Sequence, residues 1–156
     1  MLSNDSPTAK NYQFDKLYTI ASDFDLPIAL DDKMVIPTRN LGLIPGHQLN
    51  PSPQETIFIP NCCLVFEGVK KSVRELWHYV AESPESSHFK AVEPSTLIVD
   101  GPFPDITEPV ESFFIEGVML VPHAWVSWEI ESVSFYLELD STNQADSIEK
   151  ELIQVN

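Results

Sequence analysis

The last third of the chain carries the clearest pattern of apolar and polar positions. From Ala124 to Asp140 the two kinds of residue alternate, which is typical of a strand with one buried face. The expected inward residues are Ala124, Val126, Trp128 and Ile130, then Val133, Phe135, Leu137 and Leu139. The inward residues have even numbers up to Ile130 and odd numbers from Val133, so the alternation shifts by one residue at Glu131-Ser132. Neither Glu131 nor Ser132 is a Gly, Asn or Asp, the residues that a two-residue primed turn favours. We therefore predict a β-bulge within one long, bent strand and not a two-residue hairpin.

Shorter apolar runs rich in β-branched or aromatic residues predict further strands at Ile57–Ile59, Cys62–Phe66, Thr96–Val99 and Phe113–Val121. Gly68 is expected to end or bend the second of these. Pro122 cannot adopt the positive φ of a primed turn, so the connection through Pro122-His123 must be wider than two residues.

Two segments show the period of an amphipathic helix. The first has an apolar stripe that predicts a helix over about 8–22, with Ser6-Pro7 at its start. Its members are Phe14, Leu17, Tyr18, Ala21 and Phe24. The second predicts a helix over about 70–81 that Pro84 stops, with Trp77 buried. Its stripe is Val69, Val73, Leu76, Trp77 and Val80.

Prolines and glycines mark irregular connections. Between Pro37 and Pro60 they are dense enough to predict a long loop, and Asn40–Gln54 is the part in which function is sought. After Asp140 the chain turns polar, and Asp146 with Glu149 resembles a capping box, so residues 141–156 are expected to be a polar tail or a short helix.

The expected fold is α+β, mainly β: an antiparallel sheet or two-layer β-sandwich of about six to seven strands with one or two packed helices. Residues 1–140 would form a single globular domain, since 156 residues most often make one domain.

Charge restricts the class of partner. The chain has 9 Lys and Arg against 24 Asp and Glu, a formal net charge of -15. Polyanions are repelled by such a field, so nucleic acid and anionic membranes are not expected as partners, whereas a basic protein is. The start of the chain lacks a signal pattern, no run is long enough for a membrane helix, and Cys62 and Cys63 are too few for a disulfide framework. A cytoplasmic protein with reduced cysteines is expected.

Motifs for catalysis are weak. The four histidines are scattered, and Glu85-Ser86-Ser87-His88 is a single copy of a spacing that di-iron bundles use twice, so no metal is expected. No nucleophile elbow, phosphate loop or dinucleotide fingerprint is present. The cysteines precede an apolar strand and lack the electropositive setting of a nucleophile. We expect no catalytic residue and no cofactor, and the protein is interpreted as more typical of a non-enzyme.

The outward side of the C-terminal strand is the predicted binding surface. It would carry Trp125, Glu129, Glu131, Tyr136 and Glu138, with His123 at its edge. Aromatic rings among carboxylates suit a cationic protein, because rings attract cations and carboxylates accept from Arg and Lys. The first hypothesis is a non-catalytic protein-binding or inhibitory, immunity-like module. The simpler reading is a solvated face on which another part of the chain covers Trp125.

Two alternatives belong to other classes. A small-molecule or hydrolytic pocket could lie between the sheet and the 40–54 loop, lined by His47 and by Cys62 or Cys63. The chain could instead be a structural homo-oligomer, such as a homodimer joined through its sheet.

Overall fold

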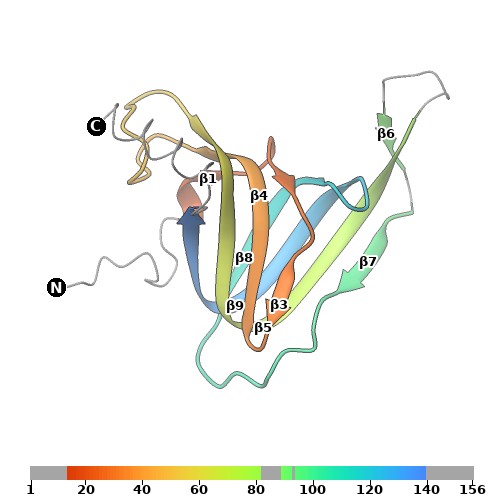
Figure 1. Cartoon of the computed structure of the whole chain (residues 1–156). Coiled ribbons are helices and arrows are strands. Elements are labelled where there is room, and N and C mark those ends of the chain that lie inside the picture. Colours follow the sequence, from red (N-terminus) through yellow and green to blue (C-terminus); the bar gives the residue numbers. More distant parts are fainter. Residues whose placement is uncertain (1–13, 82–88, 93, 140–156) are drawn as a thin grey trace.

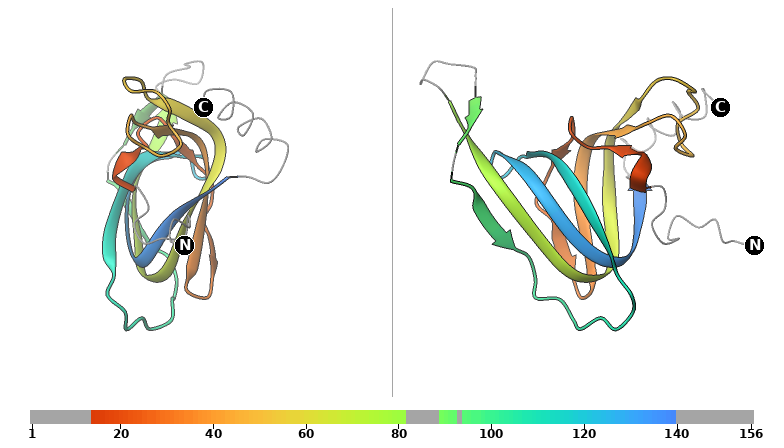
Figure 2. Two further views of the ribbon diagram at one scale, coloured as in Figure 1. Left: turned by 90° about the vertical axis from the view of Figure 1, so that its left-hand side faces the viewer. Right: turned by 180° about the vertical axis from the view of Figure 1, so that it is seen from behind.

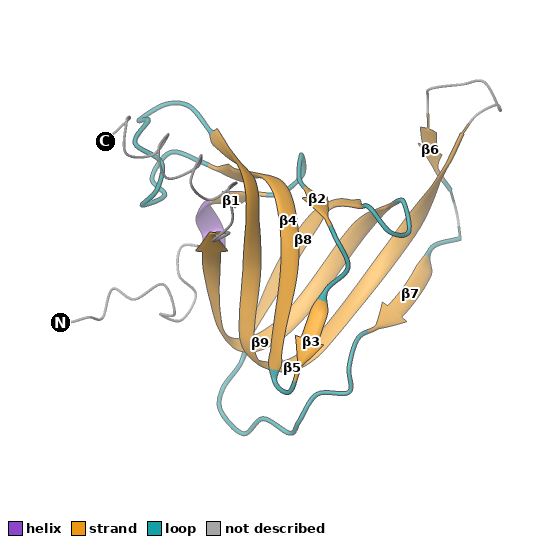
Figure 3. Cartoon of the chain, in the orientation of Figure 1, coloured by secondary structure: helices purple, strands orange, loops and turns teal. Residues whose placement is uncertain are grey.

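The computed structural model describes residues 14–81, 89–92 and 94–139. Within these ranges the chain consists of strands and their connections, and its only helical element is the 3-10 turn η1 (Phe14–Lys16) (Figure 3). The strands are β1 (Leu17–Tyr18), β2 (Asp23–Phe24), β3 (Ile28–Leu30), β4 (Lys33–Leu43), β5 (Ile57–Ala81), β6 (Phe89–Ala91), β7 (Thr96–Val99), β8 (Glu111–Met119) and β9 (Ala124–Leu139). Among the described residues, no helix has the length and apolar character that crossing a membrane demands.

The strands form one mixed sheet that closes on itself. One edge of β4 pairs with β1, β2 and β3 in turn, and its other edge pairs with the first half of β5. β5 pairs with β9 and β9 with β8, all antiparallel, and β8 meets β2 in parallel. This circuit wraps the strands around a common interior (Figures 1 and 2), while β6 and β7 lie along the second half of β5.

The prediction of an α+β fold with packed helices is therefore wrong, and so is the choice between an antiparallel sheet and a two-layer sandwich. The described chain is nearly all β, and a parallel pair, β2 with β8, completes the closure. Closure places one face of every strand in the circuit inside, so the sheet covers its own apolar face and no packed helix is needed.

The predicted helix over 70–81 is the second half of β5. Its inward residues include two polar ones, Ser72 and Arg74, which hide the alternation with a period of two. The apolar residues left over happen to repeat with helical spacing. Many of them are β-branched or aromatic, which favours strands. Trp77, expected to be buried, is half-buried on the outer face and lies opposite Trp125 of β9.

The predicted helix over 8–22 is also wrong in its described part. Residues 14–24 form η1, β1, a turn and β2, while residues 8–13 lie outside the described ranges. The ring of Phe14 makes edge contacts with Phe66, Phe113 and Phe135 at centroid distances of 6.5, 4.8 and 5.1 Å. Phe14, Leu17 and Phe24 of the predicted stripe pack in the interior of the closed sheet, whereas Tyr18 and Ala21 are exposed.

β9 confirms the prediction of one long strand in place of a hairpin. Ala124, Val126, Trp128 and Ile130 all lie inward, with exposed fractions of 0–1%. The inward set continues through Ser132 and resumes at Phe135 and Leu137, so the parity changes at Val133-Ser134 and not at Glu131-Ser132. Val133, which was expected inward, is half-buried.

The irregularity itself lies on the partner strand. In the register of β5 with β9, Val69 pairs with Ser132 and Lys71 with Glu131, which leaves Lys70 as an extra residue. Gly68 has a φ of 69° and sits against Val133. It bends β5 without ending it, and Figure 1 shows β5 and β9 turning together at the bottom of the view.

The proline-rich connection is shorter than predicted, because β4 runs on to Leu43 and β5 begins at Ile57. Pro37 fits inside β4 because its edge faces the break between β2 and β3, where its carbonyl accepts from the Asp25 N–H at 2.9 Å. Asn40 adopts a φ of 58° between two stretches of the β4–β5 ladder. Residues 141–156 and the segment Glu85–His88 lie outside the described ranges.

Candidate binding surface

The outer sides of β7, β5, β9 and β8 form one continuous surface, which we call the apolar-acidic face. Cross-strand registers arrange it in rows: Lys71, Glu131 and Ser112; Val99, Val73, Glu129 and Phe114; Leu97, Glu75, Ser127 and Glu116; and Trp77, Trp125 and Val118. The side chains of one row are direct neighbours, because strands lie about 4.8 Å apart in the plane of a sheet.

Three apolar residues of this face are largely open to water. Leu97, Val99 and Phe114 are 67, 75 and 65% exposed. Neighbouring residues of a strand point to opposite faces of the sheet. Phe113 and Ile115 are buried in the interior, so Phe114 between them points outward. Leu97 and Val99 lie together on β7, and Phe114 lies on β8 beyond β5 and β9, about 14 Å away at about 4.8 Å per strand. Exposed apolar side chains rimmed by polar ones are typical of protein–protein contact sites.

Carboxylates outnumber cations on the same face. Glu129 and Glu131 share one ammonium group, that of Lys71, at 3.4 and 3.8 Å. These side chains are 43% exposed for Lys71 and 33 and 25% for the two acids. Glu75 accepts from the Ser95 hydroxyl at 2.6 Å, and Glu116 is exposed. Four carboxylates against one ammonium leave this face negative.

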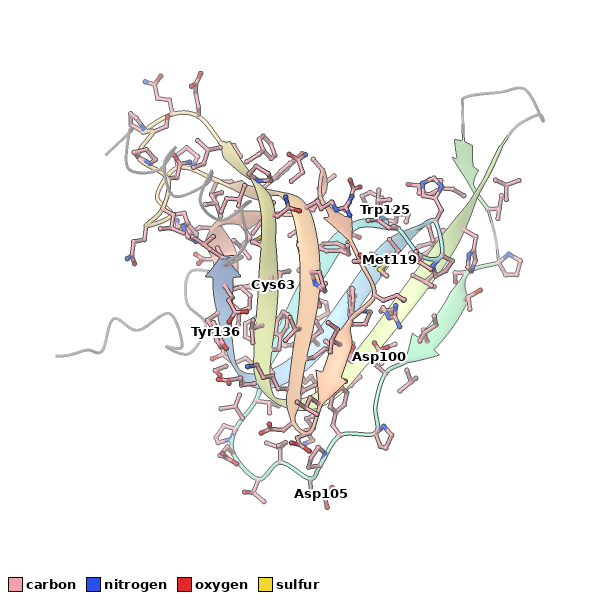
Figure 4. The ribbon with its side chains drawn as sticks, in the orientation of Figure 1. Cys63, Asp100, Asp105, Met119, Trp125 and Tyr136 are labelled. Carbon is pink, nitrogen blue, oxygen red and sulfur yellow. The ribbon has the colours of Figure 1, made fainter. Side chains whose placement is uncertain are left out.

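The structure divides the predicted surface at the bend of β9. Figure 4 shows Trp125 and Tyr136 on opposite limbs of that strand. Tyr136 is only 8% exposed, and its hydrogen bond with Lys33 of β4 raises the pKa of that ammonium group, with smaller contributions from Glu67 and Glu138. Glu138 is exposed beside this pair. Tyr136 and Glu138 therefore belong to a different part of the outer surface from Trp125, Glu129 and Glu131.

His123 and Trp125 lie at the far end of the face. His123 is exposed in the turn before β9, its ring 4.8 Å from that of Tyr79, and its carbonyl accepts from the Tyr79 N–H at 3.0 Å. Trp125 is half-buried between Trp77 of β5 and Val118 of β8. The connection through Pro122-His123 is a turn over residues 120–123, wider than two residues as predicted.

Sequence reasoning missed the exposed apolar members of the face. The run Phe113–Val121 is so continuously apolar that its period of two is hidden, although Glu116 is a signal of an outward position two residues after Phe114. The sequence around Leu97 and Val99 contains no comparable polar residue that marks the outward positions. β7 is short, and which of its faces is exposed to solvent depends on its pairing with β5.

The interior holds an ion pair that no pattern predicted. Arg74 donates from Nε and Nη2 to the two carboxylate oxygens of Asp100 at 3.1 and 2.6 Å. Ser72 donates to Asp100 at 2.7 Å and accepts from the Trp128 indole N–H at 2.9 Å. The Arg74 guanidinium carbon lies 5.1 Å from the Trp128 ring centre. These bonds hold the connection after β7 against β5.

The cysteines lie in β5, whereas His47 lies in the connection between β4 and β5. Burial raises the pKa of the Cys62 thiol, which neighbouring Cys63 raises further, so that thiol stays protonated at neutral pH. His47 is buried in the 44–56 loop, where burial lowers its pKa to about 4 and its Nδ1 accepts from the Leu49 N–H at 3.1 Å. Both cysteines border a small hollow of about 150 Å³ on the β4–β5 side, which is lined by Asp25, Pro37, Thr38, Arg39, Asn61, Cys62 and Cys63 and includes no residue of that loop.

Among the residues that the structure describes, no group of three or more His, Cys, Asp or Glu side chains could hold a metal ion. Comparison with known proteins finds no matching family model, no matching curated protein and no matching solved structure. The surface just described is therefore interpreted from its own chemistry.

Proposed function

We propose that this chain is a non-catalytic protein-binding module that docks a basic protein on the apolar-acidic face, an inhibitory, immunity-like module being one form of it. The observation that carries the proposal is one row of side chains on four neighbouring strands. Val99, Val73, Glu129 and Phe114 place exposed apolar groups on both sides of a carboxylate.

The apolar groups would supply affinity. Covering an exposed Leu, Val or Phe side chain releases about 1.5–3 kcal/mol, so Leu97, Val99 and Phe114 together form an adequate anchor for a protein partner. Aromatic anchors near the centre of an interface carry much of its binding energy. Phe114 and the half-buried Trp125 are the rings of this face.

The carboxylates would select the partner. The apolar-acidic face carries four carboxylates, those of Glu75, Glu116, Glu129 and Glu131, and one cation, Lys71, which pairs with the last two. The whole chain has a net charge of -15. A basic partner is steered by this field and can take over the carboxylate oxygens that Lys71 now shares. We place this activity in the cytoplasm, where a reducing environment keeps the thiols of Cys62 and Cys63 from forming disulfides.

The test compares two double variants that change the net charge equally. Glu129→Lys/Glu131→Lys reverses two carboxylates of the face, whereas Glu55→Lys/Asp105→Lys reverses two exposed carboxylates in the connections after β4 and β7. Each immobilised protein is challenged with native lysate, and the proteins released by salt are identified. The proposal expects one basic partner that the wild type and the connection variant retain and the face variant loses.

Loss of that partner from both variants would mean that only total charge matters, and its retention by both would remove the face from the binding site. Purified partner titrated against Phe114→Ser should then bind at least about tenfold more weakly than to the wild type, because one anchor of about 1.5–3 kcal/mol is gone. Sedimentation of the protein alone tests whether a second copy occupies this face instead.

A further inference from the structure

One edge of β8 has open backbone groups. The N–H groups of Val118 and Leu120 donate to the carbonyls of Ser22 and Phe24 at 3.1 and 2.9 Å, which defines the edge that faces away from β9. Backbone groups alternate between the two edges along a strand, and the register of β8 with β9 is unbroken from Glu111 to Met119. The N–H groups of Glu116, Phe114 and Ser112 therefore point to the same edge as that of Val118.

Within the described ranges, only the first of these three N–H groups finds a partner. Glu116 donates to the Thr19 hydroxyl at 3.3 Å. In the part of the chain that the structure describes, β8 pairs with β2 at Val118 and Met119 alone, and no bond reaches the N–H groups of Phe114 and Ser112 from this side. The ladder stops there because the turn closed by the Ser22 N–H on the Thr19 carbonyl directs β1 toward β4.

A hollow of about 270 Å³ borders this edge. Its lining is Leu17, Tyr18, Thr19, Ile20, Phe114 and Glu116. Three of these residues are exposed apolar ones, with Tyr18, Ile20 and Phe114 at 39, 50 and 65%. The hollow therefore combines an apolar lining with one carboxylate, and it borders the edge to which the N–H groups of Phe114 and Ser112 point.

We propose that an extended basic segment of a partner protein adds to this edge as a strand beside Ser112–Glu116. The inference rests on the proposed function for the chemistry of the partner and adds the way in which the partner is held. Added strands bind through main-chain hydrogen bonds, and their alternate side chains meet the residues beside them. A segment of about four or five residues, at roughly 3.3 Å each, spans Ser112–Glu116.

Charge selects this occupant over a second copy of the chain. The carboxylate in the lining is Glu116, and a second copy would bring a net charge of -15 to a surface that is already negative. A segment with Lys or Arg at alternate positions pairs with Glu116 and places the aliphatic part of its side chains on Phe114 and Ile20.

The first experiment follows amide hydrogen exchange in the ¹⁵N-labelled full chain. The probe is the peptide acetyl-Lys-Val-Lys-Val-Lys-Val-amide, and its control is the same sequence N-methylated at every residue, which keeps the charge and side chains but loses every backbone donor. We expect the Ser112 and Phe114 amides to exchange fast in the free protein. The parent peptide should slow both at least about tenfold, while the methylated peptide should not.

The second experiment removes one donor from the protein. Ser112→Pro deletes the N–H that faces the open edge and leaves the β9 side of the strand intact, while Ser112→Ala keeps that N–H. The proline variant should bind the peptide about tenfold more weakly than the alanine variant. If Ser112→Pro does not fold, the comparison of the parent peptide with the methylated peptide still tests whether main-chain hydrogen bonds hold the added strand.

Three outcomes would overturn the inference. They are slow exchange of both amides in the free protein, which would mean that the chain or a second copy already covers the edge; no peptide-induced protection; and equal protection by the methylated peptide. The two proposals fail separately, because these outcomes concern the backbone of β8, whereas loss of the partner from Glu129→Lys/Glu131→Lys concerns side chains of β9.

Discussion

The indole N–H of Trp128 and the hydroxyl of Ser72 form a 2.9 Å hydrogen bond inside the closed sheet, between β9 and β5. The same hydroxyl donates to Asp100, which holds Arg74 through two further bonds. Each of these side chains is mostly or fully buried, so the group depends on its internal partners. No acceptor in the described residues reaches Arg74 Nη1, which leaves this cation already short of one bond.

Asp100→Ala is therefore expected to destabilise the protein strongly. It leaves the Arg74 guanidinium buried without its carboxylate, and breaking a buried pair in this way costs about 3–5 kcal/mol. The free energy of unfolding from urea titration measures the loss. The double variant Arg74→Met/Asp100→Leu removes both charges and should recover most of it, and a double variant no more stable than Asp100→Ala would contradict the assignment.

Gly68→Ala should destabilise the bend of β5 for two separable reasons. A φ of 69° costs an L-residue about 1–2 kcal/mol, and a new Cβ would lie 2.6 Å from Val133 Cγ2. Adding Val133→Ala removes Cγ2 but keeps the Cβ of residue 133, which would lie 2.7 Å from the new Cβ, so it relieves only part of the contact and none of the backbone strain. Thermal unfolding should accordingly show partial rescue in the double variant, and complete rescue would exclude the backbone contribution.

His47 should make stability fall as pH drops below about 6.5. Burial lowers its folded pKa from 6.5 to about 4, so above pH 6.5 both states are neutral and its contribution is fully present. Between pH 6.5 and pH 4 the imidazole is protonated in the unfolded state but stays neutral in the folded state. The free energy of unfolding therefore falls by roughly 2–3 kcal/mol by the time the pH reaches the lower value.

The control for this pH dependence is His47→Asn, whose side-chain oxygen can still accept from the Leu49 N–H. Urea titrations at pH 7 and pH 5 give the change for each protein. The wild type should lose more stability over this interval than the variant, since the carboxylates are common to both, and parallel losses would show that His47 does not carry the effect.

Lys71→Ala should strengthen binding of a basic partner at low salt. The substitution frees Glu129 and Glu131 from their shared ammonium group and costs little stability, about 0–1 kcal/mol for an exposed pair. The partner's dissociation constant, measured by calorimetry at low and high salt, should decrease mainly at low salt. Weaker binding at both would mean that Lys71 itself contacts the partner.

Local pattern was sufficient where one strand face is apolar throughout. Trp128 and Ile130 were placed inside correctly because alternation along β9 reports directly which side is buried. Alternation also implied a single bent strand at Glu131-Ser132, within two residues of the observed change. It failed at Ser72 and Arg74, because inward polar residues are acceptable only when partners from elsewhere, here Asp100 and Trp128, satisfy them.

The predicted binding surface was divided for the same reason. Trp125 and Tyr136 share an outward pattern along one strand, but the bend that Gly68 permits in the partner strand turns their two limbs apart. Tyr136 is then covered beside Lys33, a contact that depends on the pairing of β4 with β5. The exposure of Leu97 and Val99 depends likewise on the pairing of β7.

The amino-acid order alone determined that the chain is acidic, rich in strands and lacking in recognisable catalytic motifs, and it determined the inward side of β9, because charge and alternation are local properties. Only the folded chain decided that the sheet closes on itself, that an arginine can be buried, and that β8 keeps an open edge next to an apolar hollow. Each of these depends on residues far apart in sequence, whose pairing is selected by the free energy of the whole fold and leaves no periodic trace in any one segment.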